Sequence, residues 1–243
     1  MNEELGKIAL AGLLHDIGKF GQRAGQTSDR GKDHAAVGNK FVNQYVPKHW
    51  RDALAPVGWH HGDPEGKGHE LYAVQVVMVA DRLSAGEREH YEEEEKGELK
   101  QMLSPFSRLA AASHPAWLPL SPLKLHPDHL FPDERPLDQE HIHRGYERLW
   151  QEFCQEALAL CKQHEASPNL EAYILSISDL LLRYTWCVPS AYYYDVPDVS
   201  LYDHLRATAA LAACLFAAFR DRPEELRRLA SQLRHQEAGA WPA

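Results

Sequence analysis

The sequence places a histidine and an aspartate side by side directly after an apolar run, in the segment LLHDIGK at residues 13–19. Burying a carboxylate beside an imidazole at the end of an apolar helix costs free energy unless another group compensates the charge. A second carboxylate, Asp81, lies within the apolar segment VVMVADRLSA, where the adjacent Arg82 points to a different side of a helix. Both positions therefore indicate a charged partner or a bound cation.

Further imidazoles occur on or at the ends of other apolar segments. A lone histidine in a helix is usually a surface residue or a satisfied core residue, and an aspartate such as Asp33 or Asp203 often caps a helix. Taken together, however, imidazoles and carboxylates from five segments form a ligand set suited to Mn, Fe, Ni, Co or Zn. Two ions about 3.5–4 Å apart can clamp a phosphate and activate water between them, which predicts phosphoester hydrolysis. The seven candidate ligands, with one aspartate shared between two ions, are His15, Asp16, His34, His60, His61, Asp81 and His204.

The elements that must position these residues are predicted to be helices. Seven of the fifteen prolines lie between Ser104 and Pro136, which predicts a long irregular connector there. The charge run at 87–100 is typical of a solvated surface segment. The sequence therefore predicts an all-α protein. The apolar spacing predicts helices over about 3–15, 33–46, 50–60, 70–85, 138–164, 168–186, 200–219 and 223–236.

Composition is that of an ordinary globular protein, with 44% hydrophobic and 25% charged residues in a chain of 243. A net charge of −9 argues against coating nucleic acid by bulk positive charge. Residues 1–51 carry a charge of +3, which indicates either a patch for an anionic substrate or scattered surface charge. The apolar segment 207–219 is too short to span a bilayer, the N-terminus lacks a signal-peptide pattern, and the four cysteines form no CxxC pair. We expect a soluble, cytoplasmic protein with free thiols and no membrane association.

The segment LLHDIGK is similar to the signature of the HD phosphohydrolase superfamily, whose usual order places one histidine before the HD pair and an aspartate last. Here the chain starts at HD and offers a candidate first histidine only at His204, which gives a circularly permuted order. The other matching stretches are DHAAVGNKFV, WHHGDP, VADRLSAGERE and YTWCVPS followed by VPDVSLYDH. In this order they resemble the N-terminal HD nuclease domain of the large, polymerase/cyclase-type subunit of type III CRISPR effector complexes, most closely the III-A (Csm) branch.

This resemblance implies a single permuted HD domain over residues 1–243, with core helices over about 3–90 and 168–236. It implies a nuclease for single-stranded DNA that works with the other subunits of a type III-A ribonucleoprotein and its guide RNA. The family's palm domains carry a Gly-Gly-Asp-Asp motif that is absent here. The chain ends about where the first palm would begin, so we expect an excised domain without cyclase activity.

The resemblance also implies the division of the ligands between one or two divalent ions. His15, Asp16, Asp81 and His204 would hold one ion, and Asp16 would bridge to a second ion held with His34, His60 and His61. A histidine-rich set favours a transition metal over Mg, with Mn as the first choice and Ni, Co and Fe as alternatives.

Several other residues are candidates for substrate contact. Lys19, four residues after His15, is a candidate catalytic residue for the scissile phosphate beside Asp16, or else a surface lysine at a helix end. Arg23 and Lys32 are candidates for contacts with further phosphates. Gly18 is expected to close the first helix, and Asp203 to orient His204 or to cap a helix. Phe20 and Trp59 could stack on bases, although a core position is expected for Trp59.

Two alternatives from other classes stay open. HHGDPEG is similar to a segment of the HD-GYP phosphodiesterases, without their tyrosine-proline element, so the substrate could be a nucleotide or a cyclic dinucleotide. The chain could also be a docking module with a vestigial site, although it keeps every candidate ligand.

Overall fold

The computed structural model describes residues 2–27, 33–60, 68–85, 98–109, 114–191 and 197–235. Over these ranges the regular structure is helical, with three isolated β-bridges and no strand, which confirms the all-α class. The elements are α1 (Glu3–Leu14), α2 (Ile17–Arg23), α3 (His34–Tyr45), α4 (Lys48–Arg51), η1 (Asp52–Leu54), α5 (Ala55–Trp59), α6 (Gly68–Ser84), η2 (Pro105–Arg108), α7 (Pro127–Leu130), α8 (Gln139–Ala166), α9 (Leu170–Thr185), α10 (Leu201–Phe219) and α11 (Pro223–His235).

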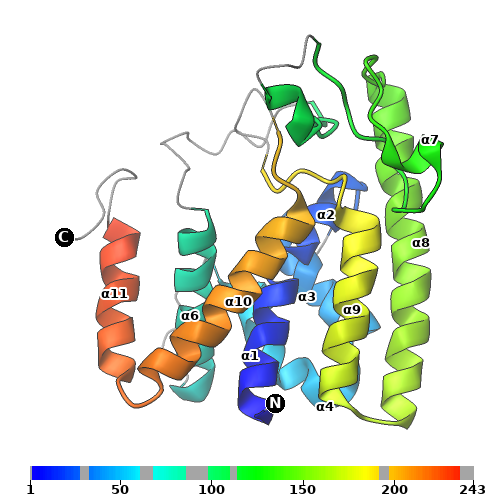
Figure 1. The fold of residues 1–243 in the computed structure, drawn as a ribbon. Helices are drawn as coiled ribbons and strands as arrows, with labels where there is room; N and C mark the ends of the chain where they lie inside the picture. The colour runs from blue at the N-terminus through cyan, green and yellow to red at the C-terminus, as the bar shows by residue number, and fades with distance from the viewer. Residues whose placement is uncertain are drawn as a thin grey trace.

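Helix α1 is the central packing element of the fold, and it contacts α5, α6, α9 and α10 (Figure 1). Its apolar residues Leu10, Leu13 and Leu14 are buried. Gly12 allows α10 to come close, because a Cβ there would lie only 2.8 Å from the Cα of Ala209. A helix near the end of the chain therefore packs along the first one, as the permuted order requires.

The HD pair lies where α1 ends and α2 begins. The expectation that Gly18 closes the first helix is wrong, because Gly18 lies within α2. A Cβ on Gly18 would lie 1.8 Å from the carbonyl oxygen of His34 and 2.6 Å from the backbone nitrogen of Gly38. The backbones of α2 and α3 therefore touch at this glycine, which holds the start of α3 against the HD junction.

The other predicted helices are confirmed to within a few residues, with one exception. The segment predicted as one helix over 50–60 is divided into α4, η1 and α5, with Pro56 in the first turn of α5. The expected core position of Trp59 is wrong, since its side chain is 42% exposed at the end of α5. Asp33 caps α3 as predicted and accepts a hydrogen bond from the backbone N–H of Ala35 at 3.0 Å.

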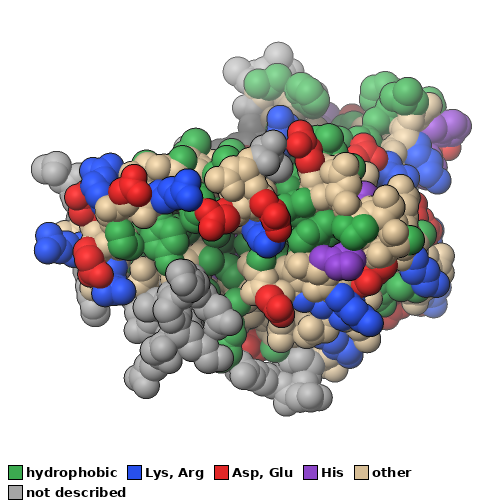
Figure 2. Space-filling view, turned by 90° about the horizontal axis from the view of Figure 1, so that it is seen from below, with side chains coloured by type: hydrophobic (Ala, Val, Ile, Leu, Met, Phe, Trp, Pro, Cys, Tyr) green, Lys and Arg blue, Asp and Glu red, His purple; other side chains and the backbone are tan. Residues whose placement is uncertain are grey.

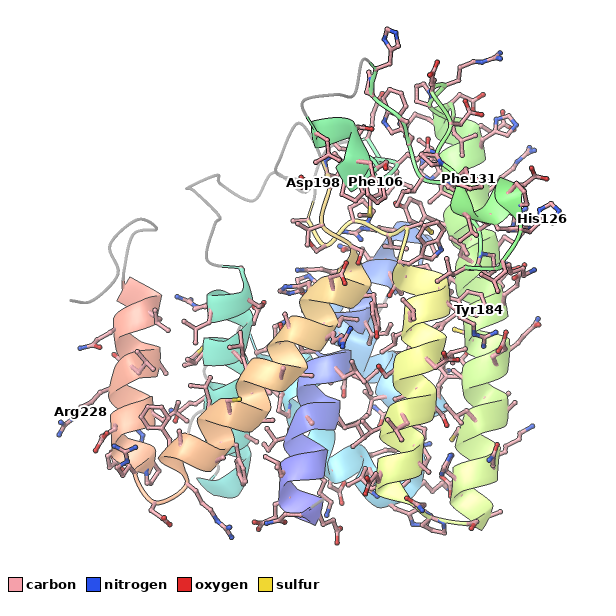
Figure 3. All side chains as sticks on the ribbon, viewed as in Figure 1. Phe106, His126, Phe131, Tyr184, Asp198 and Arg228 are labelled. Carbon is pink, nitrogen blue, oxygen red and sulfur yellow. The ribbon has the colours of Figure 1, made fainter. Side chains whose placement is uncertain are left out.

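The proline-rich connector forms an irregular cover over one end of the α8–α9 pair. Among its described residues it contains only the short elements η2 and α7. The backbone N–H of Leu123 donates to the carbonyl of Arg183 at 2.8 Å, and Nε1 of Trp186 donates to the carbonyl of Ser121 at 3.0 Å. Exposed Phe106 belongs to the same connector, beyond this end of α9 (Figure 3). The charge run predicted at 87–100 lies largely outside the described residues.

The buried apolar side chains form one core that includes residues from Ile8 in α1 to Ala230 in α11. Tyr184 of α9 faces α8, where its hydroxyl donates to the carboxylate of Glu156 at 2.6 Å (Figure 3). All four cysteines are free thiols, as expected. Acidic and basic side chains are interspersed on the face shown in Figure 2. Within the described ranges, every helix is too short or too polar to cross a bilayer.

Candidate metal centre

Five segments that are far apart in the chain bring their candidate ligands to one place. His15 ends α1, and Asp16 precedes α2. His34 is the first residue of α3, while His60 directly follows α5. Helices α6 and α10 complete the set, with one residue from each, at positions 81 and 204.

Asp16 is the shared member of the cluster, and its two oxygens face different imidazoles. Its Oδ2 lies 3.3 Å from Nε2 of His15 and 3.3 Å from Nε2 of His204. Its Oδ1 lies 3.2 Å from Nε2 of His60 and 3.6 Å from Nε2 of His34. One carboxylate therefore joins two separate ligand groups.

Asp81 completes the first of these groups. Its Oδ1 lies 3.1 Å from Nε2 of His204 and 3.4 Å from Nε2 of His15. One potential metal site thus consists of His15, Asp16, Asp81 and His204, and the second of Asp16, His34 and His60. Six of the seven candidate ligands meet as predicted, and His61 lies outside the described residues.

The first group contains buried polar atoms that lack hydrogen bonds of good geometry within the protein. Among the described residues, both carboxylate oxygens of Asp16, Oδ1 of Asp81, and Nε2 of His15 and His204 make no hydrogen bond of normal geometry and face one another and Lys19 only as charged neighbours. The side chains of Asp16 and His15 are fully buried. Buried groups of this kind are costly unless they are paired or coordinate a metal. The donor set of two imidazoles and two carboxylates therefore fits a divalent transition metal.

The rings of two histidines are oriented by their own backbone. Nδ1 of His15 donates to the carbonyl of Gly12 at 2.8 Å, and Nδ1 of His60 donates to the carbonyl of Pro56 at 3.1 Å. Because a carbonyl oxygen only accepts, the proton must reside on Nδ1 in both rings. Each Nε2 therefore directs its lone pair at Asp16 when the imidazole is neutral, as metal ligation requires.

The two carboxylates stay ionised in this pocket. Burial raises the pKa of Asp16, but the charges of Lys19 and His15 outweigh burial and hold this pKa well below its usual value. Burial also raises the pKa of Asp81, but the imidazoles of His15 and His204 beside it hold this pKa well below its usual value. The centre therefore presents two negative charges to any cation that enters.

The pKa values of two imidazoles, His15 and His34, shift in opposite directions. Burial lowers the pKa of His15, but the carboxylates of Asp16 and Asp81 outweigh it and raise the pKa to about 10. Burial dominates at His34 and lowers its pKa to about 4. Without a metal, His15 thus carries a proton at neutral pH, whereas His34 is neutral.

A pH dependence of metal binding follows from this difference. A metal must displace the proton from His15, so its affinity should rise about tenfold per pH unit below pH 10, where one proton is released per ion. Titration calorimetry at pH 7 in buffers of different ionisation enthalpy should show release of about one proton from this group. His34 adds nothing to this release, because its pKa of about 4 leaves it neutral. Binding that is independent of pH between 6 and 9 would contradict this assignment.

Lys19 lies at the centre, as predicted from its spacing. Its Nζ is 2.5 Å from Oδ2 of Asp16, and its side chain is 14% exposed. The side chains of His34 and Asp81 are each 12% exposed, whereas those of Asp16 and His15 are fully buried. Solvent therefore reaches the edge of the centre at Lys19, His34 and Asp81.

Two other predicted substrate contacts have structural roles instead, and a third lies outside the described residues. Arg23 is buried and donates to the carbonyl of Pro189, which gives its guanidinium a structural partner. Phe20 is fully buried and packs edge-on against Trp150, so it is unavailable to stack on bases. Lys32 lies outside the described residues.

Asp203 belongs to the capping network of α10 and not to the centre. Ser200 caps the helix, with its Oγ accepting from the backbone N–H of Asp203 at 3.0 Å and donating to its carboxylate at 2.7 Å. The alternative that Asp203 orients His204 is therefore wrong. The partner of His204 Nδ1 is instead Ser84 Oγ, at 3.1 Å. Sequence reasoning missed Ser84, although its position three residues after Asp81 places both on one helix face.

Residues 1–86, which contain the HD pair and most of the cluster, match the HD domain family. These residues contain all the candidate ligands except His204, which the sequence supplies from α10.

Most of the chain is similar to one group of larger HD proteins. It is 27% identical over 241 residues to the "CRISPR system single-strand-specific deoxyribonuclease Cas10/Csm1 (subtype III-A)" of Methanocaldococcus jannaschii, covering 87% of this chain and 28% of that protein. The solved structure of Csm1 from T. onnurineus has a TM-score of 0.63 at 24% identity, over 88% of this chain and 29% of that one. A Csm1–Csm4 subcomplex of the type III-A CRISPR–Csm interference complex contains a chain with a TM-score of 0.56 at 22% identity, over 88% of this chain and 28% of that one.

These similarities confirm the resemblance to the HD domain of the type III-A Cas10/Csm1 subunit. The chain spans between 27 and 29% of the length of the curated relatives that it matches.

Proposed function

We propose that this chain is a metal-dependent HD nuclease that hydrolyses phosphodiester bonds of single-stranded DNA within a type III-A CRISPR interference complex. The observation that carries the proposal is the shared carboxylate of Asp16, which joins two imidazole groups in a buried pocket. The relatives bear the name single-strand-specific deoxyribonuclease, which supports the choice of substrate.

The geometry of the two groups supports the ligand roles of the six described residues. His15, Asp16, Asp81 and His204 would hold one divalent ion. Asp16 with His34 and His60, and with His61 from the adjacent position, would hold a second. Imidazole-rich ligand sets favour Mn, Ni, Co or Fe over Mg, and Mn is our first choice. When bound, such ions supply a lowered pKa for an attacking water and charge neutralisation at the phosphate.

Lys19 is the residue we assign to the substrate phosphate. An ammonium group has three donors, so Nζ can keep its contact with Asp16 and still donate to a phosphate oxygen. Its partial exposure at the edge of the centre supports access by a phosphate from solvent. The charge that builds on the phosphate oxygens in the transition state is then partly neutralised by Lys19. A contact of Lys32 with a further phosphate is a secondary proposal.

The setting of the domain is part of the proposal. The single apolar core from α1 to α11 supports one permuted HD domain over residues 1–243, with residues 104–136 as a connector on its surface. We place the protein in the cytoplasm, as a part of the large subunit. The similarity to a Csm1 chain solved together with Csm4 supports neighbouring subunits of a guide-RNA complex as partners.

A substrate panel with the metal-stripped chain tests this function. The protein is chelated, reloaded with Mn²⁺, and offered single-stranded DNA, double-stranded DNA, deoxynucleoside triphosphates and cyclic dinucleotides. We expect cleavage of single-stranded DNA that depends on Mn²⁺ and stops on chelation. Preferential turnover of nucleotides or cyclic dinucleotides would instead establish a small-molecule phosphohydrolase. Failure to bind any transition metal after reloading would indicate a docking module.

A further inference from the structure

We propose that Ser84, supported by Thr208, is a positioning residue that fixes the Nδ1–H tautomer of His204 and so directs its Nε2 lone pair to the metal. This inference rests on the proposed metal-dependent function and concerns the same centre. It adds two hydroxyl groups, neither of which is a metal ligand, to the machinery of the site.

The hydroxyl of Ser84 lies among three polar atoms. Its Oγ is 2.8 Å from the carbonyl oxygen of Asp81, 3.1 Å from Nδ1 of His204 and 2.8 Å from Oγ1 of Thr208. Thr208 is fully buried, and His204 is 4% exposed. Ser84 is partly buried, so the network lies at the edge of the centre, and its two buried members depend on their protein partners.

Counting protons in this network assigns each donor. A serine hydroxyl has one proton, and the carbonyl of Asp81 can only accept, so Ser84 must donate to Asp81. The oxygen of Ser84 then has only lone pairs left for its other two neighbours. Thr208 must therefore donate its hydroxyl proton to Ser84, and Nδ1 of His204 must carry a proton that it donates to Ser84.

The consequence lies at the other ring nitrogen. In a neutral imidazole with its proton on Nδ1, Nε2 has a free lone pair. Nε2 of His204 lies 3.3 Å from Oδ2 of Asp16 and 3.1 Å from Oδ1 of Asp81, within the first ligand group. The network thus selects the tautomer that can bind a metal.

His204 differs in this respect from the two histidines held by their own helices. The backbone carbonyls of Gly12 and Pro56 accept hydrogen bonds from His15 and His60. These carbonyls remain when the residue at position 12 or 56 is substituted. The acceptor for His204 is a side chain from another helix. Ser84 also links α6, which carries Asp81, to α10, which carries His204. The hydroxyl therefore sets both the tautomer of the ring and its distance from Asp81.

The test measures Mn²⁺ affinity by electron paramagnetic resonance titration of the metal-stripped chain. The variants are Ser84→Ala, the conservative Ser84→Thr, His204→Ala, and the double variant Ser84→Ala with His204→Ala. Loss of an outer partner of a metal-binding histidine typically weakens affinity by about 10–100-fold, so we expect this loss for Ser84→Ala. Ser84→Thr retains the hydroxyl and should stay close to wild type. Because Ser84 acts through His204, removing it in the His204→Ala background should have no further effect.

The outcomes separate this inference from the function beneath it. Unchanged affinity in Ser84→Ala, together with a loss in His204→Ala, would overturn the positioning role and leave the metal centre standing. An equal loss from Ser84→Ala in both backgrounds would also overturn it, because the hydroxyl would then act through the fold in general. A wild-type chain that binds no Mn²⁺ would overturn both proposals. Thermal unfolding of each metal-free variant verifies that it is folded at the temperature of the titration.

Discussion

Replacing Asp16 with asparagine is expected to remove metal binding and to lower the rate of single-stranded DNA cleavage by on the order of 10³-fold or more. Asp16 is the one residue common to both ligand groups, and each of its oxygens faces a different pair of imidazoles. An amide of the same shape removes the negative charge from both groups and replaces one ligand oxygen by N–H donors. Both groups therefore lose the carboxylate charge, and one of them also loses its ligand oxygen.

The control for this variant is Asp179→Asn, the same substitution on the exposed surface of α9. Asp179 is 71% exposed and lies 3.7 Å from Arg183, away from the candidate ligands. It should leave cleavage and Mn²⁺ binding unchanged. Activity is measured on a labelled single-stranded oligonucleotide, and circular dichroism reports the helical content. Retention of full Mn²⁺-dependent cleavage by Asp16→Asn would remove Asp16 from the proposed centre.

Gly18→Ala is expected to destabilise the protein by about 3 kcal/mol or more, at the upper end for overpacking. A Cβ at this position would meet the carbonyl oxygen of His34 at 1.8 Å and the backbone nitrogen of Gly38 at 2.6 Å. Backbone atoms cannot rotate aside as a flexible side chain can, so α2 and α3 must separate. His34 starts α3, and this separation would also withdraw it from Asp16. The melting temperature should fall by roughly 6–12 °C for a chain of this size.

Gly58→Ala is the matched control for this stability prediction. A Cβ on Gly58 would have its nearest neighbours in Asn39 at 3.6 Å, an ordinary contact distance. Alanine in a helix is favoured over glycine by about 1 kcal/mol or less, so this variant should be neutral or slightly stabilised. Denaturant unfolding of the two variants gives the comparison directly. Equal stability of Gly18→Ala and Gly58→Ala would show that α2 and α3 do not touch at residue 18.

The sequence alone predicts the helices and the candidate ligands well, because both depend on local patterns. Apolar spacing locates α6 and α10, and the isolated carboxylate of Asp81 in an apolar helix already indicates a cation. The cap at Asp33 follows from residue type and position. These signals need no knowledge of which segments meet in space.

Features that depend on contacts between segments are predicted poorly. Gly18 has the residue type of a helix end, but the reason for the glycine is the backbone of α3, which lies beyond the local sequence. Trp59 is apolar and follows a helical pattern, yet it ends α5 on the exposed side. Arg23 has the charge to bind phosphate, but the carbonyl of Pro189 takes its guanidinium. The tertiary partner decides the role in all three cases.

Residues that support a metal ligand without touching the metal are the hardest to find from sequence. Ser84 and Thr208 are small polar residues in two different helices, and the only local signal is that Ser84 lies three residues after Asp81 on one helix face. Their role depends on the packing of α6 against α10, which places both hydroxyls beside His204.

The most direct test of the centre is anomalous X-ray scattering from crystals of this protein grown with Mn²⁺. The account predicts a metal peak about 2.0–2.3 Å from Nε2 of His15, Nε2 of His204 and carboxylate oxygens of Asp16 and Asp81, the usual range for such ligands. A well-ordered crystal structure in which Mn²⁺ binds elsewhere, or in which Asp81 and His204 do not touch the ion at His15 and Asp16, would contradict it.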